Sequence, residues 1–165
     1  MNIKLRPWTI NDLDSLVENA NNLEISKNLS DAFPHPYTPD NGKAFIEMAT
    51  KDDPIHIFAI DFEGRAIGGI GIHPQNDIFR KNAELGYWLG QKYWNKGIMS
   101  KFIPDMVDFA FKTYDINRVF ARVFGENISS QKALEKCGFT LESHIKGNLF
   151  KNGKFQDELI FSIRK

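Results

Sequence analysis

Two successive strand-loop-helix units constrain the fold of this chain more than any other feature. Residues 83–89 have the composition of a central strand, and a short loop, 90–96, leads from them into helically spaced apolar residues over 97–113. Residues 118–124 alternate as a strand does and lead into a second helical stretch, 127–136. Strands that alternate with helices in this way usually lie parallel in one sheet, so we expect these two strands to form its parallel part.

The remaining segments predict further strands and helices around these units. They are a strand at 3–6, helices starting near Thr9 or Asn11 and at Asp40, a hairpin of 55–62 and 66–72 turning at Glu63-Gly64, and two strands after Phe139 with a turn near 151–154. This order predicts an α/β fold with one mixed sheet. A chain of 165 residues suits one compact domain, 1–165.

The charge balance argues against polyanionic partners. Lysine and arginine number 21, and aspartate and glutamate also number 21, so the formal net charge is zero. A neutral chain has no overall field that attracts nucleic acid or an anionic membrane. We therefore expect neither partner, and local chemistry must hold any anionic ligand.

Cysteine and histidine usage gives no support to a metal site or a disulfide framework. Cys137 is the single cysteine, which excludes an internal disulfide and a site built on cysteine pairs. The histidines, His35, His56, His73 and His144, lack metal-ligand spacing. The chain has neither the apolar core of a signal peptide at its N-terminus nor an apolar run long enough to span a bilayer. We expect a cytoplasmic protein without a metal.

The most informative segment is Tyr93-Trp94-Asn95-Lys96-Gly97-Ile98-Met99-Ser100, which joins an expected strand to an expected helix. A glycine here lets the backbone turn tightly and approach a ligand. The first N–H groups of the helix, at the positive end of its dipole, then suit a phosphate or pyrophosphate. Lys92, Lys96 and Lys101 add positive charge nearby. An ordinary helix start beside solvated lysines fits the same residues.

Two other nucleotide sites are poorly supported. The chain has no GxxxxGK(S/T) phosphate loop, and no GxGxxG fingerprint follows its first strand. ATP and NAD are therefore not the expected ligands.

A second informative segment runs from Glu126 to Phe139. Asn127 can cap the helix that follows, and Ser130 sits in its first turn. Plain capping explains both residues. The alternative is that the amide of Asn127 and the hydroxyl of Ser130 face a ligand.

Together these segments resemble the GNAT superfamily of N-acetyltransferases. The resemblance rests on residues 94–100, on Asn127-x-x-Ser130 and on Lys136-Cys137-Gly138-Phe139, which follow one another in the family's order. Arg6-Pro7, Pro36-Tyr37-Thr38 and Glu84-Leu85-Gly86-Tyr87-Trp88-Leu89 make the chain most similar to the Rim-type branch, which is named for enzymes that acetylate the N-termini of ribosomal proteins. The resemblance covers nearly the whole chain.

The resemblance implies a mostly antiparallel, seven-stranded mixed sheet flanked by helices, with a splayed central parallel pair that admits the pantetheine arm of acetyl-CoA. Backbone groups of Leu89 would pair with that arm like an added strand, Asn127 would hydrogen-bond to it, and Ser130 would lie near the thioester sulfur. The pyrophosphate would be held by main-chain N–H groups of Asn95, Lys96, Gly97, Ile98, Met99 and Ser100.

Three residues depart from the family pattern in the phosphate loop. Trp94 stands where the family usually has Gln or Arg, Asn95 replaces a frequent glycine, and Met99 replaces a small residue. Because the loop acts through main-chain N–H groups, these changes bear on how closely the pyrophosphate fits.

Glu84 is the candidate general base, because an alkylammonium has no lone pair until it loses a proton. Partial burial on the central strand would raise its pKa and suit it to that role. An exposed strand carboxylate or an ion pair with Arg122 is the alternative. A backbone N–H near Trp88 or Leu89 is expected to stabilise the oxyanion, and Ser130 is the family-implied proton donor to the thiolate.

We expect direct attack by the amine in a ternary complex. Cys137 follows the end of a helix, where the dipole raises a thiol pKa, so core packing suits it better than a ping-pong nucleophile.

The acceptor pocket is expected to involve Phe33, His35, Tyr37 and Trp88, although these side chains would equally anchor the proline-rich loop. The acceptor would be a protein N-terminus, such as that of a ribosomal protein, or a small amine, and the protein would be a monomer or homodimer. The competing function is a non-catalytic CoA-binding sensor or scaffold.

Overall fold

The computed structural model describes residues 2–165, so that only Met1 lies outside it. Its α-helices and β-strands are β1 (Ile3–Pro7), α1 (Leu13–Ala20), α2 (Leu23–Ser26), α3 (Pro39–Thr50), β2 (Ile57–Phe62), β3 (Arg65–Pro74), β4 (Asn82–Leu89), α4 (Ile98–Thr113), β5 (Arg118–Phe124), α5 (Ile128–Lys136), β6 (Thr140–Lys151) and β7 (Lys154–Arg164).

The strands form one seven-stranded sheet in the order β1-β2-β3-β4-β5-β7-β6. β4 and β5 are parallel, whereas β2 pairs antiparallel with β1 and β3, and β7 with β5 and β6. The predicted α/β fold, with a mostly antiparallel mixed sheet and a central parallel pair, is confirmed. The parallel pair is the one that the two strand-loop-helix units predict.

The contacts within the chain divide it into two compact units. The first holds residues up to Gly71 together with Tyr87–Lys96, and the second holds Ile72–Gly86 and Gly97–Lys165. The domain boundary expected from the sequence, 1–165, stays a prediction.

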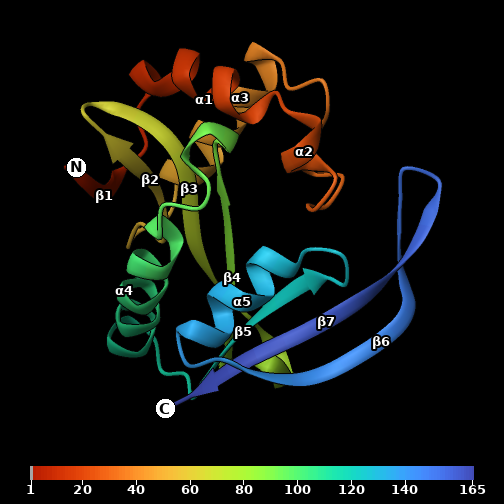
Figure 1. The fold of residues 1–165 in the computed structure, drawn as a ribbon. Helices are drawn as coiled ribbons and strands as arrows, with labels where there is room; N and C mark the ends of the chain where they lie inside the picture. The colour runs from red at the N-terminus through yellow and green to blue at the C-terminus, as the bar shows by residue number, and fades with distance from the viewer. Residues whose placement is uncertain (1) are drawn as a thin grey trace. The chain divides into compact units, whose positions relative to one another are not determined.

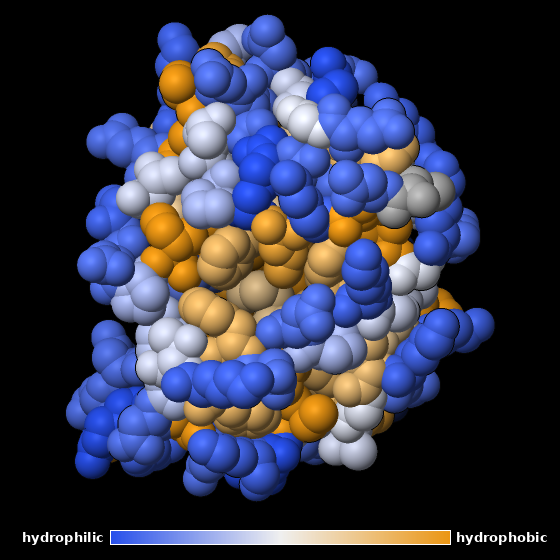
Figure 2. Space-filling model, turned by 90° about the vertical axis from the view of Figure 1, so that its left-hand side faces the viewer, coloured by the Kyte–Doolittle hydropathy of each residue, from blue (hydrophilic) through white to orange (hydrophobic). Residues whose placement is uncertain are grey.

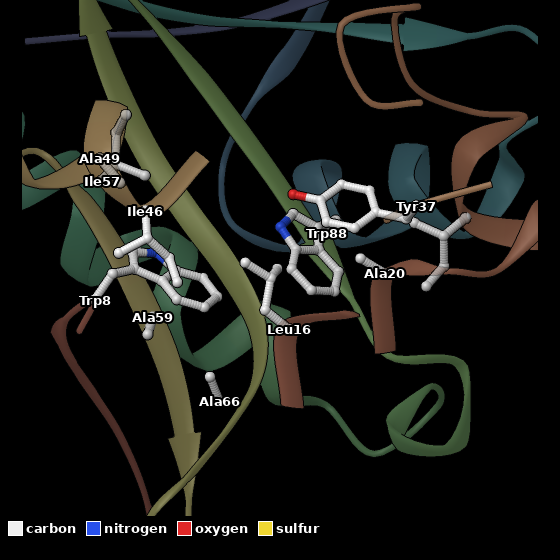
Figure 3. Close-up of a cluster of buried hydrophobic side chains, with 11 residues drawn as sticks. Trp8, Leu16, Ala20, Tyr37, Ile46, Ala49, Ile57, Ala59, Ala66 and Trp88 are labelled. Carbon is white, nitrogen blue, oxygen red and sulfur yellow. The ribbon is translucent and has the colours of Figure 1, made fainter. Parts of the chain in front are cut away.

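The core of the first unit gathers around two tryptophans (Figure 3). Trp8 and Trp88 lie with ring centroids 6.5 Å apart and planes 16° from parallel, among small buried side chains such as Ala20, Ala59 and Ala66. A Cβ on Gly69 would lie 2.9 Å from Trp88 Nε1 and 3.2 Å from Trp8 Cζ2. β3 therefore needs a glycine at this position so that the indoles can pack against its backbone.

A buried ion-pair network joins β1 to β2 in the same unit. The Arg6 guanidinium contacts both carboxylate oxygens of Asp12, at 2.7 and 2.8 Å, and Asp61 Oδ2 at 2.5 Å. Both aspartates are buried, so Arg6 compensates two charges that water does not reach.

The second unit builds on the β6–β7 hairpin and β5, with α4 and α5. Figure 1 shows β6 and β7 running together as a long curved hairpin whose turn extends beyond α5. Ile103, Met106 and Ala110, spaced three and four residues apart on α4, are fully buried, as the helical periodicity predicts.

The start of α3 differs from the expectation. The expected cap, Asp40, lies inside the helix, and Thr38 is the N-cap, its hydroxyl accepting the Asn41 N–H at 3.2 Å. Pro39 takes the first helical position, where its missing N–H costs nothing.

The surface mixes apolar with hydrophilic side chains, as the face in Figure 2 shows. Of the most exposed large apolar side chains, Ile78 lies in a short 3₁₀ helix between β3 and β4, and Phe150 and Phe155 flank the β6–β7 turn. No helix within residues 2–165 combines the length and apolarity that a bilayer crossing requires.

Candidate functional site

The parallel ladder between β4 and β5 is short. It pairs Asn82 with Arg118, Ala83 with Val119 and Glu84 with Phe120. β4 continues through Leu85 and β5 through Ala121, and the described ladder has no pair beyond Glu84.

The first turn of α4 has the geometry expected of an anion site. Its N-cap, Gly97, has φ 72°, a left-handed conformation that glycine adopts without strain. Among residues 2–165, no side-chain hydrogen bond caps this end of the helix, and apart from Gly97 and its two chain neighbours no atom lies within 4 Å of the position where a Cβ would stand on Gly97. The first amides of this sixteen-residue helix lack acceptors within the helix, and they lie at its positive end.

The residues before Gly97, in the first unit, explain two departures from the family pattern. Asn95 has φ 60°, and asparagine is among the few non-glycine residues that tolerate this region, so it can replace a glycine here. The indole Nε1 of Trp94 donates to the carbonyl oxygen of Leu89 at 2.7 Å. Trp94 thus connects the loop to the end of β4, and the Leu89 carbonyl oxygen already accepts a hydrogen bond from within the chain. No contact within residues 2–165 accounts for Met99.

The lysines near this segment also contact other side chains. Lys92 Nζ lies 3.1 Å from Glu18 Oε1. The centre of the Tyr93 ring lies 5.3 Å from Lys92 Nζ and 5.6 Å from Lys96 Nζ. In the second unit, Lys101 Nζ lies 5.1 Å from the Phe102 ring. All are surface side chains, so a phosphate would meet them at little cost in desolvation.

Asn127 and Ser130 lie where the sequence places them. Asn127 is the N-cap of α5, and its Oδ1 accepts the Ser130 N–H at 3.3 Å. The capping interpretation is therefore confirmed for the oxygen of the amide, while a ligand contact through its nitrogen stays a prediction.

Glu84 lies on β4 in an environment that suits a proton acceptor. Its side chain is one-third exposed, and Oε1 lies 3.7 Å from Arg122 Nε. Burial raises the pKa of Glu84; the positive charge of Arg122 opposes this effect and the negative charge of Glu158 adds to it, so that the pKa stays above its ordinary value. The ion pair with Arg122 and the raised pKa, which the sequence offers as alternatives, are both present.

His73 is a titratable neighbour of Glu84 that the sequence does not single out. The Gln75 N–H donates to the Asn82 carbonyl at 2.9 Å, a register that places His73 of β3 opposite Glu84. His73 Nε2 lies 3.8 Å from the position of a Cβ on Gly86, which shares a face of β4 with Glu84. Only the antiparallel register of β3 and β4, which no local pattern encodes, reveals this neighbour.

The predicted acceptor residues form an aromatic group in the first unit, apart from His35, which is exposed. The Phe33 ring centre lies 5.1 Å from that of Tyr37 and 5.5 Å from that of Trp88. Tyr37 and Trp88 are buried in the core cluster, and burial raises the pKa of Tyr37 to about 12. For these two residues the structure favours the anchoring role over direct contact with a substrate.

Cys137 is placed as a packing residue. Burial raises the pKa of its thiol, and its Sγ lies 3.6 Å from the carbonyl oxygen of Ser100. A thiol with a raised pKa is a poor nucleophile. No cluster of three or more metal-ligating side chains occurs among residues 2–165.

Known proteins resemble this chain along most of its length. Residues 2–140 match the family model of the acetyltransferase (GNAT) domain. YdaF of Bacillus subtilis, a putative ribosomal N-acetyltransferase, is 30% identical over 104 residues, which cover 63% of this chain and 56% of YdaF. The spermidine N(1)-acetyltransferase of Escherichia coli K12 is 24% identical over 95% of this chain and 83% of its own length.

Solved structures share the fold. The ribosomal L7/L12 alpha-N-protein acetyltransferase RimL, in complex with coenzyme A, superposes with a TM-score of 0.84 at 19% identity, over 99% of this chain and 94% of RimL. The fold and the family model thus define an acetyltransferase-type α/β domain. The chain belongs to the GNAT acetyltransferase family, as its sequence predicts.

Proposed function

We propose that this chain is an acetyl-CoA-dependent N-acetyltransferase. The observation that carries the proposal is the first turn of α4, where Gly97 has a left-handed conformation and no side-chain hydrogen bond from residues 2–165 caps the helix. Amides of Asn95, Lys96, Ile98, Met99 and Ser100 would complete the pyrophosphate site.

The chemistry follows from the groups around β4 and α5. Acetyl-CoA supplies a thioester, and Glu84 takes a proton from the acceptor ammonium, directly or through water. The freed amine then attacks the thioester carbonyl, and a backbone N–H near Trp88 or Leu89 stabilises the oxyanion. Collapse breaks the carbon–sulfur bond, the attacking nitrogen releases its second proton, and the thiolate takes up a proton through the Ser130 hydroxyl, which is reprotonated in turn, or from solvent.

The acceptor would be a primary amine. Two carboxylates, Glu84 and Glu158, share one guanidinium, that of Arg122, and so leave one uncompensated negative charge when both are ionised. Such a site suits an ammonium. The similar proteins include a ribosomal L7/L12 alpha-N-protein acetyltransferase and a spermidine N(1)-acetyltransferase, so an N-terminal peptide and a polyamine are the two acceptor classes to test.

Release of free thiol from acetyl-CoA, measured with peptides and polyamines as acceptors, tests the proposal. We expect turnover with at least one class, and Glu84→Gln to lower kcat by about 10²- to 10⁴-fold while CoA affinity stays unchanged. Glu135→Gln, an exposed glutamate on α5, is the control and should keep full activity. CoA binding without turnover toward any amine would favour the sensor or scaffold function instead.

A further inference from the structure

Glu158 is a buried carboxylate in the middle of β7, with both oxygens engaged. Oε1 lies 2.6 Å from Arg122 Nη1, and Oε2 accepts from Asn148 Nδ2 at 2.5 Å, while the side chain is only 3% exposed. Removing a carboxylate from water at this depth is costly, and these two partners compensate the cost.

A bulge in β6 brings Asn148 to Glu158. The β6–β7 register shifts between Ile145 and Leu149, Gly147 has φ 63°, and its N–H donates to Asp157 Oδ1 at 3.0 Å. A β-bulge re-aims the side chains around it. Here the re-aimed side chain is Asn148, so the irregular part of the hairpin anchors Glu158.

Arg122 is consequently held away from Glu84. Its Nη1 is fixed by Glu158, and its guanidinium carbon lies 5.5 Å from the centre of the Phe120 ring. Its Nε stops 3.7 Å from Glu84 Oε1, beyond hydrogen-bond distance.

We propose that Glu158 is a positioning residue for the reaction: by pinning Arg122, it prevents a close Arg122–Glu84 ion pair and leaves the Glu84 carboxylate able to take a proton from the acceptor amine. This inference rests on the proposed function of Glu84 as the base. It deepens that function by assigning a task to two charged residues, Arg122 and Glu158.

The charged or titratable side chains near Glu84 come from three other strands. They are Arg122 of β5, Glu158 of β7 and His73 of β3, while Arg118 of β5 is bound to Asn82 and Glu142. The positive charge of Arg122 lowers the pKa of Glu84, and the negative charge of Glu158 raises it. Loss of the Arg122 charge should therefore raise the pKa of Glu84, and loss of the Glu158 charge should lower it.

The test compares Glu158→Gln, Arg122→Gln and the double variant with the wild type. Titration of ¹³C-labelled glutamate carboxylates by NMR, with the Glu84 signal assigned by its loss in Glu84→Gln, reads the pKa directly. Glu158→Gln should lower the pKa of Glu84, because it removes a negative charge and frees Arg122 to approach. Arg122→Gln should raise it, and the double variant should fall between the two single variants.

The pH dependence of kcat/KM gives the second readout. The acidic limb should move to lower pH in Glu158→Gln and to higher pH in Arg122→Gln. At the plateau, Glu158→Gln should lose less activity than the roughly 10²- to 10⁴-fold expected for loss of the base. Glu126→Gln, an exposed glutamate paired with Lys154, should change neither readout.

Shifts in the same direction for both single variants, or no shift in Glu158→Gln, would overturn the positioning role. Should Glu158→Gln not fold, the double variant provides the test. If the pKa of Glu84 in the double variant is no lower than in Arg122→Gln, the inference is contradicted. The NMR titration needs no turnover, so a protein without acetyltransferase activity that still shows opposite shifts would refute the proposed function and leave the electrostatic arrangement intact.

Discussion

The indole Nε1 of Trp94 donates a hydrogen bond to the carbonyl oxygen of Leu89 at 2.7 Å. This bond joins the first residue of the proposed pyrophosphate loop to the last residue of β4. If it pre-organises the loop, Trp94→Phe should weaken CoA binding by about two- to tenfold, the equivalent of one hydrogen bond of roughly 0.5–1.5 kcal/mol. Calorimetric titration with CoA measures the change. Tighter binding by the variant would mean that the indole competes with the pantetheine for Leu89.

Asn127 is expected to serve both α5 and the cofactor, and substitutions can separate the two tasks. Asn127→Asp keeps the oxygen that accepts the Ser130 N–H but loses the amide donor, so it should retain thermal stability and bind CoA more weakly. Asn127→Ala should in addition destabilise the protein by about 0.5–2 kcal/mol. Thermal unfolding and CoA titration of both variants provide the comparison. Wild-type affinity in Asn127→Asp would restrict Asn127 to capping.

The ion pair of Arg6 with Asp12 should make the free energy of unfolding depend on pH in the acidic range. Burial raises the pKa of Asp12, but hydrogen bonds from Arg6 and Thr9 outweigh burial and hold the pKa below its ordinary value of 3.8. A group whose pKa is lowered by folding stabilises the protein above its unfolded pKa, and this contribution is lost as pH falls through the folded value. The free energy of unfolding should therefore decrease below about pH 4.

Arg6→Met leaves Asp12 and Asp61 buried without their cation and should cost about 3–5 kcal/mol at neutral pH. Urea unfolding at several pH values measures both effects. Because the variant has lost the favourable pairing, its stability should fall less steeply toward low pH than that of the wild type. A parallel fall in both proteins would contradict the role given to Arg6.

Local patterns predict most of the fold. The strand predicted over 118–124 has the same bounds as β5, and the helix predicted from the spacing after Gly97 is α4. Glycine and asparagine also mark their positions well, since Gly97 needs a left-handed backbone and Asn127 caps α5. The cap of α3 is predicted less well, because Thr38 and Asp40 are both good capping residues and only Pro39 distinguishes between them.

The site is less predictable than the fold, because strand register and bulges assemble it. Glu84, Arg122 and Glu158 come from three strands, and no spacing in the sequence signals that they meet. The bulge that directs Asn148 toward Glu158 depends on the pairing of β6 with β7. His73 likewise becomes a neighbour of Glu84 only through the antiparallel pairing of β3 and β4.

The most direct test of the proposed cofactor site is CoA binding to Gly97→Ala, with Gly153→Ala as the matched control. Both glycines have left-handed backbones, with φ 72° and 74°, and at neither would a Cβ meet an atom within 4 Å. Both variants should lose a similar stability, roughly 1–2 kcal/mol. Calorimetry should show that the wild type and Gly153→Ala bind CoA alike, and that Gly97→Ala binds at least about tenfold more weakly, a loss of about 1.4 kcal/mol. Absence of CoA binding to the wild type, or equal affinity in all three proteins, would contradict the account.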